Sequence, residues 1–164
     1  AALVLLAGLS CNAVAAEAGN LSEKDRQEII VLIHNYSYMF DSRNLDSFLD
    51  LFSQDATWKA FFGGSPAPEM VLDSPVEFRQ VFGNQMRLYA ADGIQSRHFI
   101  TNPMIYRAGP GLADGTAMFL VTHQYCEEPE STAILLHTGE YRYQFVKTRS
   151  GWKFGSIEAH ADHK

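Results

Sequence analysis

The chain has 164 residues, of which 46% are hydrophobic and 20% are charged, a balance typical of one folded domain whose core needs no metal or crosslink. Its formal net charge of -6 and its scattered basic residues exclude the concentrated positive surface that nucleic-acid binding requires. Aromatic residues are frequent, with 11 Phe, 7 Tyr and 2 Trp, and such side chains line both cores and small-molecule pockets. We therefore expect a small molecule, and no nucleic acid, as the partner.

The first residues are typical of the remainder of a secretory signal peptide. Residues 1–16 carry no charge, and Ala13-Val14-Ala15 offers a small-x-small cleavage site. The run is shorter than the about 20 apolar residues of a stable membrane span. Lipidation of Cys11 is the alternative. We predict an exported protein, periplasmic or secreted, with a single domain over residues 17–164 and, after cleavage, no internal disulfide.

Three helices are predicted in the first half of the chain. Ser22 is a suitable N-cap for a helix with an apolar stripe at Ile29, Ile33, Tyr36 and Phe40. Further predicted elements are a short helix over 45–52 capped by Asn44, a strand-like segment over 56–62, a Gly/Pro-rich loop over 63–68, and a third helix beginning at Ser74-Pro75.

Beyond Ser96 the hydrophobic period changes from helical to alternating. Strands are predicted near 97–107, 115–127, 134–148 and 152–160, with a hairpin at Ser150-Gly151. Helices followed by antiparallel strands indicate an α+β fold. We expect about three N-terminal helices packed on one face of a strongly curved antiparallel sheet.

Three polar residues interrupt the apolar patterns: Asp41 at the end of the first helix, His98 at the start of the first long strand, and His123 in the next strand. A carboxylate beside an imidazole fixes its tautomer and stabilises its charged form, so such a pair can take and return a proton near neutral pH. These three are the candidate catalytic residues. The alternatives are that Asp41 opens the turn after the helix and that His98 is a half-buried histidine bonded to a backbone group.

Other polar residues have weaker claims. Tyr36 and Tyr125 could orient a ligand through their hydroxyl groups, although tyrosines in an apolar stripe usually pack. His137 is expected to face solvent. A metal site made of His34, His98 and Asp41 is a minor alternative, because nothing in the sequence fixes their distance. With no phosphate loop, zinc-type spacing or activated nucleophile in the sequence, we predict no cofactor and no metal.

An ordered set of segments resembles the SnoaL-like domains of the NTF2-like superfamily. The matching segments are Phe40-Asp41-Ser42-Arg43-Asn44-Leu45-Asp46, Arg97-His98-Phe99-Ile100-Thr101-Asn102, Asp114-Gly115-Thr116-Ala117, Gly139-Glu140-Tyr141 and Gly151-Trp152-Lys153-Phe154. The resemblance covers residues 22–158. It implies a cone, in which a bent sheet wraps around helices and leaves an apolar cavity open at one end.

Locally, the chain is similar to the scytalone dehydratases. Asp41 and His98 match their helical acid and the histidine of their H-F-I stretch, and His123 is a looser match to their second histidine. Two departures concern the tyrosines of that family, because Phe40 precedes the acid and residues 58–62 contain no tyrosine. The resemblance therefore supports an acid and histidine pair more strongly than one particular dehydration.

These observations predict a cofactor-independent lyase or isomerase for a small cyclic or polyketide-like molecule. His98 would be the general acid/base, Asp41 would orient it and His123 would assist, while Tyr36 and Asn102 would position the substrate. A non-catalytic binding protein for a small apolar ligand is the alternative.

We also expect a homodimer formed through the sheet face. Its candidate residues are Tyr141, Tyr143 and Phe145, which would serve equally well in the core.

Overall fold

A computed structural model describes residues 21–128 and 130–163 of the chain. The predicted signal-peptide remnant, residues 1–16, lies outside the described residues, so export and cleavage stay predictions. Within the described part, no helix is long and apolar enough to cross a membrane.

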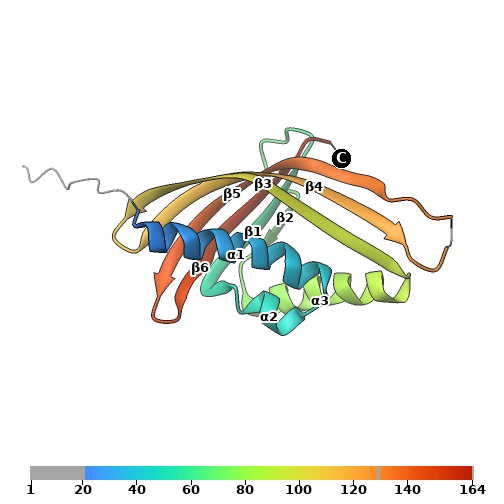
Figure 1. The fold of residues 1–164 in the computed structure, drawn as a ribbon, viewed down its shortest axis with the longest axis horizontal. Helices are drawn as coiled ribbons and strands as arrows, with labels where there is room; N and C mark the ends of the chain where they lie inside the picture. Colours follow the sequence, from blue (N-terminus) through green and yellow to red (C-terminus); the bar gives the residue numbers. More distant parts are fainter. Residues whose placement is uncertain (1–20, 129, 164) are drawn as a thin grey trace, which may run out of the picture.

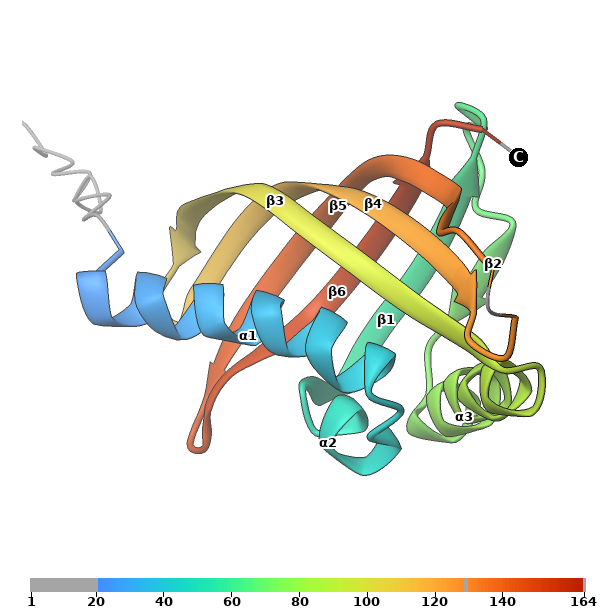
Figure 2. The ribbon, with the colours of Figure 1, turned by 45° about the vertical axis from the view of Figure 1, so that its right-hand side comes forward.

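Three helices and a six-stranded sheet make up the fold. In chain order the elements are α1 (Glu23–Asp41), α2 (Leu45–Leu49), β1 (Phe52–Phe62), β2 (Met70–Leu72), α3 (Pro75–Ala91), β3 (Ile94–Gly109), β4 (Leu112–Tyr125), β5 (Ile134–Thr148) and β6 (Gly151–Ala161). The strand order is β2-β1-β6-β5-β4-β3. The sheet curves over α1, while α2 and α3 lie at one end (Figures 1 and 2).

The predicted α+β architecture is confirmed, with two corrections of detail. First, α2 ends at Leu49 and β1 already begins at Phe52, and the short strand β2, which was not predicted, also precedes α3. Second, β1 and β6 pair in parallel, whereas the other neighbouring strands are antiparallel. Because α3 and three long strands separate β1 from β6 in the chain, no hairpin dictates their relative direction.

The predicted caps set the beginning of two helices. Ser22 accepts a hydrogen bond from the backbone N–H of Asp25 at 3.1 Å, and Ser74 accepts one from that of Glu77 at 3.3 Å. From Ser22 the helical period buries one face of α1 against the sheet, a face that consists of Ile29, Leu32, Ile33, Tyr36 and Phe40. This orientation brings Asp41, the last residue of α1, to the edge strand β3.

The inner face of the sheet is the core face. Tyr141, Tyr143 and Phe145 of β5 all point inward and are buried, so they cannot form the predicted dimer surface. Gly139 continues this inward row, and a Cβ there would lie 2.1 Å from the His160 carbonyl oxygen and 2.8 Å from Cζ of Phe119. Only glycine allows this close packing of β5, β6 and the Phe119 ring.

Candidate active site

Asp41 and His98, both predicted as catalytic, are in direct contact. The backbone N–H of His98 donates to Oδ2 of Asp41 at 2.7 Å, and Nδ1 of the His98 ring lies 2.6 Å from Oδ1. Their side chains are only 9% and 13% exposed, respectively. A carboxylate in this position makes Nδ1 the protonated nitrogen. The Nε2 atom of His98 is therefore the nitrogen left for a ligand.

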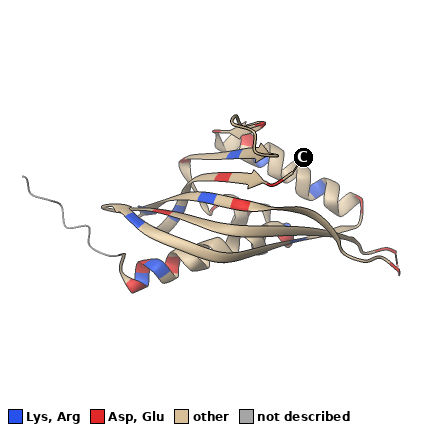
Figure 3. Cartoon of the chain, turned by 90° about the horizontal axis from the view of Figure 1, so that it is seen from above, with Lys and Arg blue, Asp and Glu red and all other residues tan. Residues whose placement is uncertain are grey.

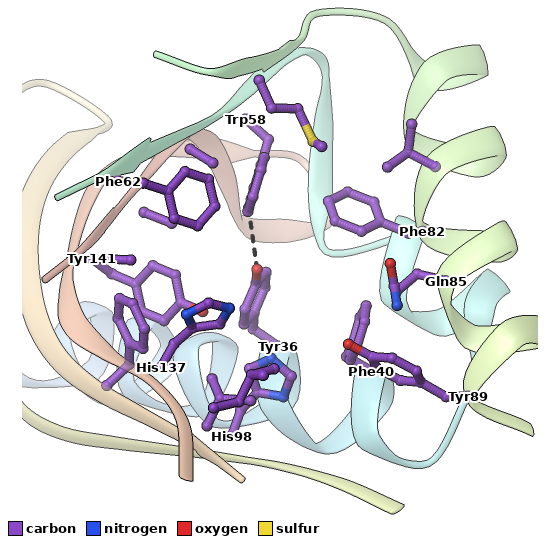
Figure 4. Close-up of a pocket in the computed structure, with 18 residues that line it drawn as sticks. Tyr36, Phe40, Trp58, Phe62, Phe82, Gln85, Tyr89, His98, His137 and Tyr141 are labelled. Atoms are coloured by element: carbon purple, nitrogen blue, oxygen red, sulfur yellow. Dashed lines mark hydrogen bonds between the residues drawn. The ribbon is translucent and has the colours of Figure 1, made fainter. Parts of the chain in front are cut away.

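His98 forms part of the wall of a cavity of about 210 Å³ (Figure 4). The lining residues are Tyr36, Phe40, Trp58, Ala60, Phe62, Met70, Val81, Phe82, Gln85, Tyr89, His98, Phe119, Val121, Leu136, His137, Tyr141, Ala159 and Ala161. Within the described residues, this lining contains no Lys, Arg, Asp or Glu. An apolar cavity of about 150 Å³ holds a benzene ring. The volume and chemistry here suit an uncharged molecule of one or two rings.

Hydroxyl groups cluster at one wall of this cavity. Nε1–H of Trp58 donates to the hydroxyl oxygen of Tyr36 at 3.2 Å, and the Tyr36 and Tyr141 rings meet edge to face at 5.7 Å (Figure 4). Burial raises the pKa of Tyr36 to about 12, although hydrogen bonds with Trp58 and Tyr141 lower it in part. Burial likewise raises the pKa of Tyr141 well above its ordinary value. Both phenols therefore stay protonated and can serve a ligand as neutral hydrogen-bonding groups.

His123, the third predicted catalytic residue, lies behind the wall rather than in it. Its ring packs edge-on against Tyr89, with centroids 4.6 Å apart. Its Nε2 atom is buried and has no hydrogen-bond partner among the described residues. Burial, and then the neighbouring His98 and His137, lower its pKa. The structure thus places His123 close to the site but not among the residues lining the cavity.

His137, which we expected to face solvent, lines the cavity instead. It has the same parity along β5 as the inward-facing Tyr141, so strand alternation already turns it inward. The register between β4 and β5 shifts at Leu136: Val121 pairs with His137, whereas the next residue, Thr122, pairs with Leu135. The resulting bulge brings Leu136 into the cavity as well.

Two predicted substrate-binding residues lie elsewhere. Asn102 is exposed at a bulge of β3, where its φ of 54° interrupts the alternation of side chains, and its amide contacts Sδ of Met118 at 3.7 Å. Tyr125 is 40% exposed at the end of β4. Among the predicted ligand contacts, Tyr36 is the one that the structure brings into the cavity.

Sequence reasoning missed Trp58 and Tyr89 as cavity residues. A signal existed for Trp58, because Ala56 and Ala60 flank it with the spacing of one strand face and are both buried. Tyr89 lies near the end of α3, where the helical stripe alone does not show that a cavity begins.

Metal binding has no support in the described residues, which contain no group of three His, Cys, Asp or Glu able to hold a metal ion.

The curved sheet, the helices packed against it and the cavity between them define a fold of the NTF2-like type. A family model described as a SnoaL-like domain matches residues 22–158, so the chain belongs to the SnoaL-like family. No curated protein sequence matches the chain.

Several solved structures share the fold. A protein assigned as a scytalone dehydratase from Novosphingobium aromaticivorans is 17% identical, with 84% of each chain covered and a TM-score of 0.64. The β subunit of the benzoate 1,2-dioxygenase from Burkholderia mallei is 13% identical, with 84% of this chain and 90% of that chain covered and a TM-score of 0.68. Aln2 from a Streptomyces species is 18% identical, with 88% and 95% covered and a TM-score of 0.68. At these identities the likeness establishes the fold alone.

Proposed function

We propose that this SnoaL-like protein is a cofactor-independent lyase or isomerase for a small cyclic or polyketide-like molecule. The supporting observation is that Asp41 holds His98 through two hydrogen bonds at the wall of an uncharged cavity. Asp41 keeps the proton on Nδ1, which leaves the lone pair of Nε2 toward the ligand. Its negative charge also stabilises the imidazolium formed when Nε2 takes a proton. A reversible proton acceptor beside an apolar ligand suits elimination of water or migration of a double bond.

The cavity wall supports an uncharged substrate. A carboxylate or phosphate entering it would lose its hydration without meeting a cation, because no Lys or Arg is among the described lining residues. A ring with hydroxyl or keto groups loses less on entry, and it gains hydrogen bonds from Tyr36, Tyr141 and Gln85.

The test is a screen of neutral hydroxylated and keto derivatives of one- and two-ring compounds, monitored by ultraviolet absorbance as conjugation changes. His98→Gln and Asp41→Asn should each lower turnover by about 100-fold or more. Asp46→Asn is the matched control, because the Asp46 side chain is 84% exposed and pairs with Arg79. Turnover that survives in both His98→Gln and Asp41→Asn would contradict the proposal.

A non-catalytic binding protein is the second candidate. The observation that favours it is the preformed cluster of Tyr36, Trp58 and Tyr141, which can orient a ligand without any chemistry. For this function, His98→Gln would change the affinity for a ligand measured by calorimetry, and no compound of the screen would be converted by the unaltered protein.

We also propose a homodimer, formed through the outer face of β3, β4 and β5. Phe99, Met104, Tyr106 and Met118 are each more than half exposed on this face. Beside them on β5, Glu140 and Arg142 form an ion pair of 2.8 Å, so two copies related by a twofold axis can exchange these partners. Only a few charged segments interrupt these strands, and both signs occur among them (Figure 3).

Sedimentation of the full chain tests the dimer. Met118→Lys should shift the dimer to monomer, whereas Val76→Lys, on the exposed side of α3, should leave the dimer intact. A monomer at all concentrations of the unaltered chain would contradict this proposal.

A further inference from the structure

His137 and His98 lie two strands apart on the same wall of the cavity. Val121 of β4 pairs in register with His98 on β3 and with His137 on β5, so the two imidazoles flank Val121 on one face of the sheet. Two strand spacings of about 4.8 Å place their backbones about 10 Å apart. Both side chains line the same cavity (Figure 4). A ligand bound over Val121, which also lines the cavity, is within reach of both imidazoles.

The backbone on both sides of His137 is held in place. The carbonyl oxygen of Leu136 accepts a hydrogen bond from Nε2–H of His163 at 3.1 Å. On the other side, Thr138 donates through its hydroxyl to Asp162 at 2.7 Å. These contacts tie the β5 backbone beside His137 to the residues that follow β6.

His137 differs from His98 in its protonation. Burial, followed by the nearby His163 and His98, lowers the pKa of His137, so its ring is neutral at neutral pH. No carboxylate contacts it among the described residues. Its Nδ1 atom is shut off from solvent and has no hydrogen-bond partner there. No acceptor among the described residues faces Nδ1, so a proton there would be a buried N–H without a partner, whereas a proton on Nε2 can be donated to a ligand; we therefore assign the proton of the neutral ring to Nε2.

We propose that His137 is a second catalytic residue: its Nε2–H donates a hydrogen bond to the carbonyl oxygen of a cyclic ketone while Nε2 of His98 takes a proton from the adjacent carbon. The C–H bond breaks, its electron pair forms the C=C bond, and the C=O π pair moves to oxygen. The proton ends on His98, and the enolate oxygen is stabilised by His137. No further reactant is needed. This inference rests on the proposed acid/base function and names a substrate class for it.

The inference assigns to His137 the contribution that the sequence suggested for His123. Both are histidines of neighbouring strands and both have a lowered pKa. They differ in place, because His137 lines the cavity and His123 packs behind Tyr89. A comparison of the two residues therefore tests the inference directly.

The first measurement uses 2-tetralone, a neutral two-ring ketone, in D₂O, with exchange of its protons next to the carbonyl followed by NMR. His137→Phe should lower the exchange rate at saturating ketone by about 100-fold, the effect of losing one donor to an oxyanion. The loss in His123→Phe should be at least about 10-fold smaller. His34→Gln, on the exposed side of α1, is the control and should match the unaltered protein. An equal or larger loss in His123→Phe overturns the inference.

The second measurement does not depend on turnover. The ¹³C resonance of carbonyl-labelled 2-tetralone should move downfield on binding, lose that movement in His137→Phe, and regain part of it in His137→Gln, which keeps a donor. A shift without proton exchange would refute the acid/base function but leave His137 as the ketone donor. Failure of the unaltered protein to bind 2-tetralone, or loss of the shift in Tyr36→Phe but not in His137→Phe, overturns the inference itself.

Discussion

Asp41 has a structural and a chemical role, and two substitutions separate them. Asp41→Ala leaves the backbone N–H and the ring Nδ1–H of His98 without their acceptor, in a place where both side chains are almost buried. Each such group costs about 1–3 kcal/mol, so Asp41→Ala should lower the free energy of unfolding by about 3 kcal/mol. In Asp41→Asn, Oδ1 can still accept the backbone N–H while the NH₂ group donates to Nδ1. The expected loss there is about 1 kcal/mol.

The Asn variant should nevertheless lose its activity. If the NH₂ group of Asn donates to Nδ1 of His98, the ring proton must move to Nε2, so the lone pair that faced the cavity disappears. The corresponding change in a serine protease triad lowers kcat by about 10⁴-fold through the wrong tautomer. The loss of about 100-fold or more proposed for this variant is therefore expected with the fold retained.

Urea unfolding and ¹⁵N NMR of the histidine rings measure the two roles independently. Asp46→Ala serves as the control for removing an exposed carboxylate. The reasoning is refuted if Asp41→Asn is as unstable as Asp41→Ala, or if His98 in the Asn variant keeps its proton on Nδ1.

Two further predictions concern stability. Burial lowers the pKa values of His123 and His137 below the ordinary 6.5. As the pH falls below 6.5, these histidines therefore take up protons in the unfolded chain before they do so in the folded chain. The free energy of unfolding is highest above that pH and decreases as the pH drops. Urea unfolding from about pH 7 to about pH 5 should therefore show a flatter profile for the double variant with Phe at both positions, and an unchanged slope would count against this. Gly139→Ala should lower the free energy of unfolding by about 2–3 kcal/mol, since its Cβ would meet a backbone oxygen. Gly109→Ala, whose Cβ would make ordinary contact with Leu112 at 3.7 Å, is the control, and equal losses in both would contradict the packing argument.

The elements with local signals were predictable from the sequence. Ser22 and Ser74 begin helices because capping depends on neighbouring residues alone, and the Ser150-Gly151 turn joins β5 to β6 as expected. The parallel pairing of β1 with β6 and the short strand β2 were not predictable. Both depend on contacts between segments far apart in the chain, which periodicity does not record.

The difference between local signals and long-range contacts also explains which site residues could be predicted. Asp41 and His98 interrupt strong apolar patterns, so their positions on a buried face could be predicted, and the structure brings them together. The inward direction of His137 was available from its parity with Tyr141. The bulge at Leu136 was not, because a register shift depends on how two strands pair rather than on the sequence of one. Asn102 was misplaced for the same reason, since it lies at a bulge of β3.

The fold explains why the site is at the edge of the sheet. The outer edge of β3 pairs with no strand among the described residues, and side chains from α1 and the turn after it occupy it instead. Arg26 donates to the carbonyl oxygen of Ile105 at 3.2 Å, Arg43 donates to that of Ile94, and Asp41 accepts the N–H of His98.

The carboxylate of Asp41, for which we propose a catalytic role, is therefore also one of the groups that attach α1 to the sheet. An exposed strand edge requires such partners in any case, because unpaired backbone groups invite association with other chains. Orienting the His98 ring thus needs no additional buried charge, because the carboxylate that accepts the backbone N–H at the strand edge also holds the imidazole. A substitution that improves catalysis by moving Asp41 would have to replace this edge contact, which limits how far the pair can change while the fold persists.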